Sequence, residues 1–224
     1  MVNILPMKTK ILLTICLLLL SACRGKQNEQ KTVNPETSEI RDSTYIFDGQ
    51  TLNGWEITNF GPQGPVYVSG GEIILGFGDG CTGITYKKEF PETNYKVCLE
   101  AKRVAGVDFF CGMTFPVGKD PCTLIVGGWA GTTVGLSSID GNDASENETT
   151  RQMKFETDRW YEICLLVKED SIRAWIDDSL VVDFFVDDKR LTIRPEVELS
   201  KPFGIASWHT TAALRNIRVI SLKE

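Results

Sequence analysis

Residues 160–185 read WYEICLLVKEDSIRAWIDDSLVVDFF, and their apolar side chains recur at every second position. The alternating apolar residues are Tyr161, Ile163, Leu165, Val167, Ile172, Ala174 and Ile176. A period of two is typical of half-buried β-strands. Turn-forming residues, Glu169-Asp170-Ser171 and Asp177-Asp178-Ser179, separate the runs. The stretch therefore predicts a three-stranded antiparallel meander.

The same periodicity extends outward from the meander. Residues 94–101 alternate in the same way, and shorter, glycine-richer runs precede and follow them. These runs are Val66–Ser69, Glu72–Phe77, Gly83–Phe90, Val107–Phe115 and Leu124–Val126. Residues 131–150, GTTVGLSSIDGNDASENETT, are small and polar, which favours a long loop. Many short strands without a long amphipathic helix predict a single antiparallel β-sandwich over residues 45–224.

The N-terminal residues have the composition of an export signal. Lys8 and Lys10 precede an apolar run from Ile11 to Leu20, which is too short to span a bilayer comfortably. The ending Leu-Ser-Ala-Cys resembles the bacterial lipobox, which implies cleavage after residue 22 and acylation of Cys23. We expect a signal peptide over residues 1–22, a polar tether over residues 23–44, and a lipid-anchored location in the bacterial cell envelope.

The overall charge excludes one class of partner. The chain carries a formal net charge of −6, and the expected signal peptide removes only lysines from that balance. An acidic surface without a basic stripe repels a phosphate backbone. We therefore expect no nucleic-acid partner.

The cysteines predict a fold that does not depend on disulfides. Of seven cysteines, Cys16 would leave with the signal and Cys23 would carry lipid, which leaves an odd number. Cys98 and Cys164 lie inside strand-like runs, where a buried thiol acts as a small apolar residue. We expect buried thiols there rather than a disulfide framework, and the spacing of the cysteines does not suit a structural zinc site.

Two motifs resemble a known family. Residues 45–55, YIFDGQTLNGW, resemble the opening of the 3-keto-disaccharide hydrolase family, and His209 followed by Leu214-Arg215-Asn216-Ile217 resembles its closing pattern. The matching positions of the opening are Phe47, Asp48, Gly49, Leu52, Gly54 and Trp55. The resemblance implies a concanavalin A-like β-sandwich, or jelly roll, and a substrate that is a glycoside oxidised at C3.

A ketone at C3 of a sugar changes the chemistry of glycosidic cleavage. The ketone acidifies the proton on C2, and the glycosidic oxygen on C1 can then leave by elimination. This reaction needs a base near C2, a group that polarises the ketone and an acid near the leaving oxygen. It does not need the carboxylate pair of an ordinary glycosidase.

The candidate acid and base groups lie mostly near the C-terminus. His209, the single histidine of the chain, suits the role of base, and the alternative is an ordinary hydrogen bond at a strand end. Glu196 and Glu198 are expected to share a strand face with Arg194, which would bind substrate. A solvated charged face is the plainer interpretation of that pattern. Asp108 lies beside two phenylalanines and is a further catalytic candidate, or else a paired strand-end acid.

The candidate sugar platforms are tryptophans in polar, glycine-rich surroundings. Trp129 and Trp208 fit this description, whereas Trp55, Trp160 and Trp175 are expected to serve packing. Trp129, Trp208 and Arg194 are therefore the predicted substrate-binding residues.

An acidic cluster in the expected loop raises the question of a metal. Its members are Asp140, Asn142, Asp143, Glu146 and Glu148. Calcium is the candidate ion, but the spacing does not match an EF-hand, and a solvated acidic loop is the favoured interpretation. No cofactor is required by the sequence.

Two functions follow from these residues. The leading hypothesis is a hydrolase or lyase that cleaves a 3-keto-glycoside, and the alternative is a non-catalytic carbohydrate-binding lipoprotein. In both cases the ligand is an oligosaccharide or a keto-sugar glycoside. A scaffold in a surface complex would instead require a flat apolar patch.

Overall fold

The structure, a computed structural model of the chain, describes residues 40–222, with side chains from Ser43 onward. The expected signal peptide, Cys23 and most of the expected tether lie outside the described residues. No helix among residues 40–222 is both long and apolar enough to cross a membrane.

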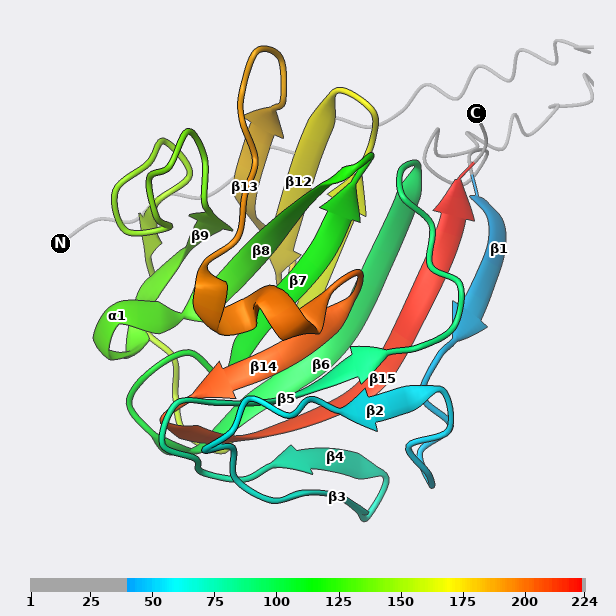
Figure 1. Cartoon of the computed structure of the whole chain (residues 1–224), viewed down its shortest axis with the longest axis vertical. Coiled ribbons are helices and arrows are strands. Elements are labelled where there is room, and N and C mark those ends of the chain that lie inside the picture. The colour runs from blue at the N-terminus through cyan, green and yellow to red at the C-terminus, as the bar shows by residue number, and fades with distance from the viewer. Residues whose placement is uncertain (1–39, 223–224) are drawn as a thin grey trace, which may run out of the picture. The chain divides into compact units, whose positions relative to one another are not determined.

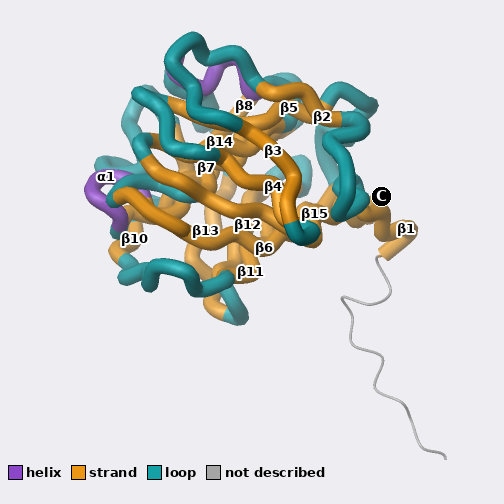
Figure 2. Tube along the Cα trace, turned by 90° about the horizontal axis from the view of Figure 1, so that it is seen from below, coloured by secondary structure: helices purple, strands orange, loops and turns teal. Residues whose placement is uncertain are grey.

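Two antiparallel sheets pack face to face (Figures 1 and 2). In the eight-stranded sheet, seven strands follow the order β13-β12-β11-β6-β15-β4-β3, and β1 also pairs with β15. The strands of this sheet are β1 (Ile40–Tyr45), β3 (Val66–Ser69), β4 (Glu72–Leu75), β6 (Tyr95–Gly106), β11 (Tyr161–Val167), β12 (Ser171–Ile176), β13 (Ser179–Phe185) and β15 (Thr210–Leu222). The expected β-sandwich is confirmed.

The second sheet has seven strands in the order β10-β9-β8-β7-β14-β5-β2. They are β2 (Trp55–Ile57), β5 (Cys81–Tyr86), β7 (Cys111–Val117), β8 (Asp120–Gly127), β9 (Thr133–Ser137), β10 (Arg151–Gln152) and β14 (Gly204–Trp208). Two short helical segments, α1 (Gly128–Gly131) and η2 (Pro195–Ser200), adjoin this sheet. In Figure 1 the orange turn of η2 crosses in front of it.

The predicted meander forms β11, β12 and β13. Leu165 lies opposite Ala174, and Ile172 lies opposite Phe184, so the alternating apolar residues share the inner face of the sheet. Their side chains are buried in the core between the two sheets. The polar end of Tyr95 is also satisfied there, because its hydroxyl donates to the carbonyl of Pro116 in the facing sheet at 2.7 Å.

The sheet begins earlier than the sequence predicted. β1 starts at Ile40, inside the stretch expected to be a tether, and Thr44 lies opposite Val219 of β15. The polar composition of this stretch hid the strand, because β1 adds to the sheet through backbone hydrogen bonds, which do not depend on apolar side chains. Residues 131–150 also differ from the expected loop, since Thr133–Ser137 form the fully buried strand β9.

The prediction for Cys98 and Cys164 was wrong, because they form a disulfide. The two residues lie directly opposite each other on β6 and β11. Facing residues on neighbouring antiparallel strands bring their Cβ atoms close enough to be linked. Cys81, Cys111 and Cys122 are free and buried, which agrees with the expectation of unpaired thiols.

The opening motif serves the architecture. The carboxylate of Asp48 accepts hydrogen bonds from the backbone N–H groups of Gln50 and Thr51, both at 2.7 Å, and thereby closes a turn. Trp55 donates its indole N–H to the carbonyl of Ile46 at 2.7 Å and packs edge-on against Tyr86. The predicted packing role of Trp55 is confirmed.

Candidate functional site

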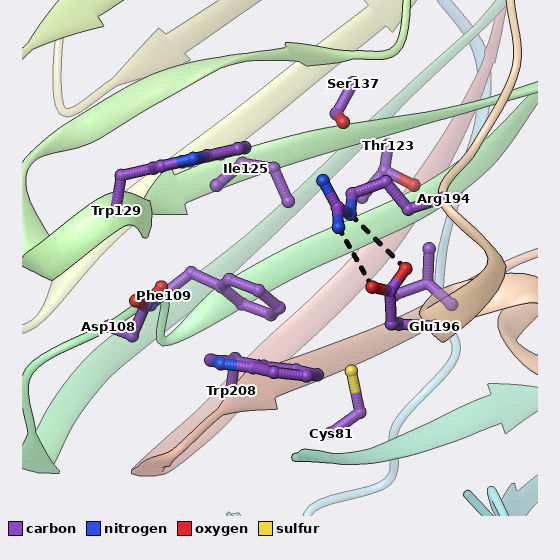
Figure 3. Close-up of a pocket in the computed structure, with 11 residues that line it drawn as sticks. Cys81, Asp108, Phe109, Thr123, Ile125, Trp129, Ser137, Arg194, Glu196 and Trp208 are labelled. Carbon is purple, nitrogen blue, oxygen red and sulfur yellow. Dashed lines mark hydrogen bonds and ion pairs between the residues drawn. The ribbon is translucent and has the colours of Figure 1, made fainter. Parts of the chain in front are cut away.

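A pocket of about 210 Å³ opens on the outer face of the seven-stranded sheet (Figure 3). It is lined by Cys81, Asp108, Phe109, Thr123, Ile125, Trp129, Ser137, Arg194, Glu196, Val197 and Trp208. Five of the predicted site residues therefore meet in one place, although they come from four separate segments. These five are Asp108, Trp129, Arg194, Glu196 and Trp208.

The floor of the pocket follows from strand alternation. On β8, Leu124 and Val126 point into the core, so Thr123 and Ile125 face the other side. The neighbouring β7 has Gly112 at this level, and a side chain there would collide with the ring of Phe109 at 2.9 Å. The glycine thus lets Phe109 lie close to the sheet.

Trp129 is held on a left-handed turn. Its φ is 47°, that of Ala130 is 65°, and Gly127 and Gly131 on either side also have positive φ. Non-glycine residues rarely adopt this conformation, and a bulky side chain there calls for an explanation. The turn leaves the indole 38% exposed and directed along one wall of the pocket (Figure 3).

Two charged side chains, Arg103 and Asp108, hydrogen-bond to the backbone of this turn. Arg103 is buried and donates from Nη2 to the carbonyl of Gly131 at 3.0 Å. Asp108 accepts the N–H of Phe109 at 2.7 Å and that of Ala130 at 3.4 Å. Burial lowers the pKa of Arg103, and the charge of Asp108 opposes that shift. Asp108 thus reaches the pocket, and its carboxylate is engaged by backbone donors of the wall.

Arg194, Glu196 and Glu198 do not share a strand face, so that prediction was wrong. Pro195 begins the 3-10 helix η2, and a proline lacks the N–H that an inner strand would need. Arg194 and Glu196 turn into the pocket, where Nη2 to Oε1 measures 2.9 Å and Nε to Oε2 measures 3.3 Å. Glu198 is not among the lining residues and pairs with Lys201.

The ion pair between Arg194 and Glu196 determines the protonation state of the carboxylate in the pocket. Arg194 Nη1 also binds Asp143 Oδ2, so one guanidinium lies between two carboxylates. The hydrogen bonds from Arg194 lower the pKa of Glu196, and those from Glu196 raise the pKa of Arg194. Glu196 is therefore ionised at neutral pH. Burial, followed by the nearby charge of Glu196, raises the pKa of the Cys81 thiol to about 12.

His209 lies beside the pocket rather than in its lining. It follows Trp208 at the start of β15, with a φ of 42°. Its ring contacts Trp208 edge-on, with centroids 5.0 Å apart, and Phe77, with centroids 5.9 Å apart. Within residues 43–222 its side chain makes no hydrogen bond to Asp108 or Glu196. The structure thus shows no direct pairing of the predicted histidine base with either of these carboxylates among the described residues.

Several lining residues were missed by the sequence reasoning. Phe109 stacks on Trp208, with centroids 6.5 Å apart and an interplanar angle of 30°. Phe109 and Val197 read as ordinary core residues, and Thr123, Ser137 and Cys81 carry no signal of their own. Pro195 was the one signal in the sequence for the backbone shape at this site. A proline marks the end of extended backbone, so it indicated that a strand does not continue through residues 194–198.

Three of the four acidic residues of the 140–148 loop pair with cations of the protein. Asp140 and Glu148 both pair with Lys189, and Asp143 pairs with Arg194. Among residues 43–222, the one group of metal-ligating side chains whose atoms converge is Cys98, Glu162 and Cys164. The disulfide removes both thiolates of that group. These contacts agree with the favoured interpretation of a charged loop over a calcium site.

Comparison with solved structures shows the fold. The chain is similar to a carbohydrate-binding module, CBM66, from Bacillus subtilis (16% identity, TM-score 0.53, 75% of this chain and 96% of that chain). It is also similar to a laminarinase from Flavobacterium sp. UMI-01 (14%, TM-score 0.51, 82% and 100%). A third similar structure is the Crh5 transglycosylase in complex with NAG (14%, TM-score 0.57, 83% and 86%).

At these identities the likeness concerns architecture alone, and the sandwich is shared by enzymes and binding modules. No curated protein matches the chain. The opening motif, which builds the turn at Asp48, and the closing motif, His209 with Leu214-Arg215-Asn216-Ile217, both fall inside the segment that a family profile matches. That segment is residues 42–220, and the chain belongs to the 3-keto-alpha-glucoside-1,2-lyase-like domain family.

Proposed function

We propose that the protein is a carbohydrate-active enzyme that cleaves the glycosidic bond of a 3-keto-glycoside in this pocket. The observation that carries the proposal is the convergence of two aromatic walls, Trp129 and Trp208, with the Arg194–Glu196 pair. Aromatic faces suit the C–H faces of a sugar ring, and a charged pair suits its ketone and C2 proton. The family membership supports the same substrate class.

The proposed roles follow from the charge of the Glu196 carboxylate and from the N–H donors of Arg194 that are not already hydrogen-bonded. Glu196 is ionised and accepts the proton from C2, and the electron pair of that C–H bond passes to the C3 oxygen as an enolate. When the ketone re-forms, that electron pair makes the C1–C2 double bond. The C1–O bond breaks, and the leaving oxygen takes up the proton that Glu196 received. The alcohol that leaves C1 is the first product; water then adds at C1 and a proton returns to C2, which gives the 3-keto sugar as the second product. The ketone at C3 carries the negative charge during the first step.

Arg194 is placed to bind that ketone oxygen. Three of the five N–H donors of a guanidinium are used by Glu196 and Asp143. The remaining donors are free to stabilise the developing enolate. In this proposal Trp129 and Trp208 bind the ring, and Asp108 serves chiefly to hold the Trp129 turn rather than to transfer a proton.

The test is an activity screen of the purified full chain against glycosides and their 3-keto derivatives, with and without a chelator. We expect release of free sugar from the 3-keto derivatives only, and its loss in Trp129→Ala/Trp208→Ala. Trp175→Ala is the matched control, because Trp175 lies on β12 of the other sheet, under Lys96. Release from plain glycosides at the same rate would contradict the keto-sugar assignment.

The second candidate is a non-catalytic carbohydrate-binding protein. The absence of a hydrogen bond from the His209 side chain to a pocket carboxylate, among residues 43–222, favours it, as does the engagement of Glu196 and Asp108 by donors of the protein itself. It predicts saturable sugar binding, weakened in the Trp129→Ala/Trp208→Ala variant, without release of product. Calorimetry beside the activity screen separates the two functions.

We also propose that the chain is anchored by lipid at Cys23 in the bacterial cell envelope. The support is the sequence Leu-Ser-Ala-Cys after the apolar run. Growth with a radiolabelled fatty acid should label the protein, and Cys23→Ala should abolish the label. A labelled Cys23→Ala variant would overturn the anchor.

A further inference from the structure

A line of aromatic rings continues from the pocket onto the surface. We define the aromatic strip as Phe109, Trp208, His209 and Phe77. Successive ring centroids along it are 6.5, 5.0 and 5.9 Å apart. Phe109 and Trp208 line the pocket, whereas Phe77 is 57% exposed. The strip therefore starts inside the pocket and ends outside it.

The exposed end of the strip is fixed by backbone hydrogen bonds. His209 donates its N–H to the carbonyl of Gly80 at 3.2 Å, and Gly76 donates to Pro65 at 2.7 Å. The N–H of Asp79 donates to the carbonyl of Pro62 at 3.0 Å, so the backbone on both sides of Phe77 is held by hydrogen bonds. An aromatic side chain that is exposed on a fixed backbone loses little conformational entropy when a ligand covers it.

The pocket itself is small. Its volume of about 210 Å³ lies below the ~300–1,000 Å³ of sites for drug-sized ligands, so it suits one sugar ring. A longer glycan bound there would have to leave the pocket. Trp208 forms the wall shared by the pocket and the strip, so the next ring on that side would meet His209 and Phe77.

We propose that His209 and Phe77 form a second sugar platform, and that the ligand is a neutral oligosaccharide with at least one unit outside the pocket. The inference rests on the proposed sugar-binding role of the pocket and deepens it. A pyranose with equatorial hydroxyl groups presents apolar C–H faces, which pack on aromatic rings as other apolar surfaces do.

The charges around the pocket favour a neutral ligand over an acidic one. Asp108, Asp143 and Glu196 bring three carboxylates near the site, and Arg194 already pairs with two of them. The chain as a whole is also acidic, with a formal net charge of −6. A uronic acid or a sulfated sugar would be repelled by this field.

The test is calorimetric titration of the purified full chain with glucose and with neutral gluco-oligosaccharides, α-linked and β-linked, from two to six units. We expect affinity to rise with length in the wild type. Phe77→Ala should weaken binding of the oligosaccharides about tenfold and leave binding of glucose unchanged. Phe185→Ala is the matched control, because Phe185 is 59% exposed on β13, at the opposite edge of the eight-stranded sheet from β3 and β4.

Two results would overturn the platform. One is an affinity that does not depend on length, and the other is equal binding of long members by Phe77→Ala and the wild type. In both results glucose still binds, so the pocket assignment survives. Absence of binding at every length would overturn the pocket assignment together with the platform.

Discussion

Arg194 and Glu196 face each other through two hydrogen bonds, one of 2.9 Å from Nη2 and one of 3.3 Å from Nε. The two residues are separated in sequence only by Pro195, and the 3-10 helix that begins there turns both into the pocket. The pair keeps a carboxylate ionised at the one edge of the pocket where no aromatic ring lies. The chemistry proposed for the site depends on this carboxylate.

Replacement of Glu196 by Gln should reduce turnover of a 3-keto-glycoside by about 100-fold or more, because general bases contribute roughly 10²–10⁴ in rate. The thermal midpoint should change little, since both partners are partly exposed and such pairs stabilise weakly. Glu198→Gln is the control, because Glu198 lies on the same helix and pairs with Lys201 outside the pocket. Equal losses in both variants would remove Glu196 from the mechanism.

The pH profile should report the same carboxylate. Arg194 lowers the pKa of Glu196 below its ordinary 4.5, so the carboxylate stays ionised as the pH falls from 7 to 5. We expect kcat/KM to stay level over that range and to fall only below about 4.5. Arg194→Met removes the cause of the shift and should move the acidic limb upward. An acidic limb at pH 6–7 in the wild type would instead point to a histidine.

The lowered pKa of Glu196 also makes the stability of the fold depend on pH. A depressed pKa in the folded state means that the ionised form is favoured by folding. The contribution of Glu196 is therefore present above its ordinary pKa and is lost as the pH falls through the lowered value. Urea unfolding at pH 7 and pH 4 should show a smaller difference in Glu196→Gln than in the wild type.

Arg103 should control sugar binding without touching the sugar, because it holds the carbonyl of Gly131 in the turn that carries Trp129. Arg103→Met should weaken binding about tenfold and destabilise the fold by ~1–3 kcal/mol, the cost of an unsatisfied buried group. The surface pair Arg173–Asp183, on β12 and β13 of the same sheet as Arg103, provides the control variant Arg173→Met.

A double-mutant cycle separates positioning from general damage. If Arg103 acts through Trp129, Arg103→Met/Trp129→Ala should bind no more weakly than Trp129→Ala alone. Additive losses in binding would show that Arg103 affects the site by another route.

The strands were predictable because burial alternates along them. Tyr95, Val97 and Leu99 face the core as their spacing predicts. β1 escaped prediction because its pairing with β15 depends on backbone hydrogen bonds and on the length of the partner strand. The Cys98–Cys164 disulfide escaped because strand register, which places these residues opposite each other, is a property of the assembled sheet.

The site was predictable in its residue types and not in its shape. Trp129, Trp208 and Asp108 stood out as unusual residues in their surroundings, and all line the pocket. The left-handed turn at Trp129 depends on Arg103, which is distant in sequence and lies just beyond the predicted strand of residues 94–101. Glu198 was wrongly grouped with Glu196, since a 3-10 helix sends the two side chains in different directions.

The disulfide should stabilise the domain and leave the pocket unaffected. Cys98 and Cys164 are 66 residues apart, and a loop of that length corresponds to roughly 4 kcal/mol in the chain-entropy model. Cys98→Ala/Cys164→Ala should therefore unfold at a lower urea concentration, with unchanged sugar affinity at 25 °C. Cys111→Ala/Cys122→Ala is the control for loss of buried sulfur, because both thiols are free. An equal loss of stability in the two double variants would contradict a specific contribution from the disulfide.

His209 decides between two roles that predict different results. As a base it would be needed for turnover of every keto-glycoside, but its ring packs on Trp208 and Phe77, and among residues 43–222 it makes no hydrogen bond to Asp108 or Glu196. We expect His209→Phe to preserve turnover of a 3-keto-disaccharide, because the aromatic surface is kept, and His209→Ala to weaken binding of longer oligosaccharides. Measurement of kcat and KM for both variants separates the roles. A loss of kcat in His209→Phe by about 100-fold would make His209 the base. Phenylalanine keeps the aromatic surface, so such a loss would come from the missing imidazole nitrogens.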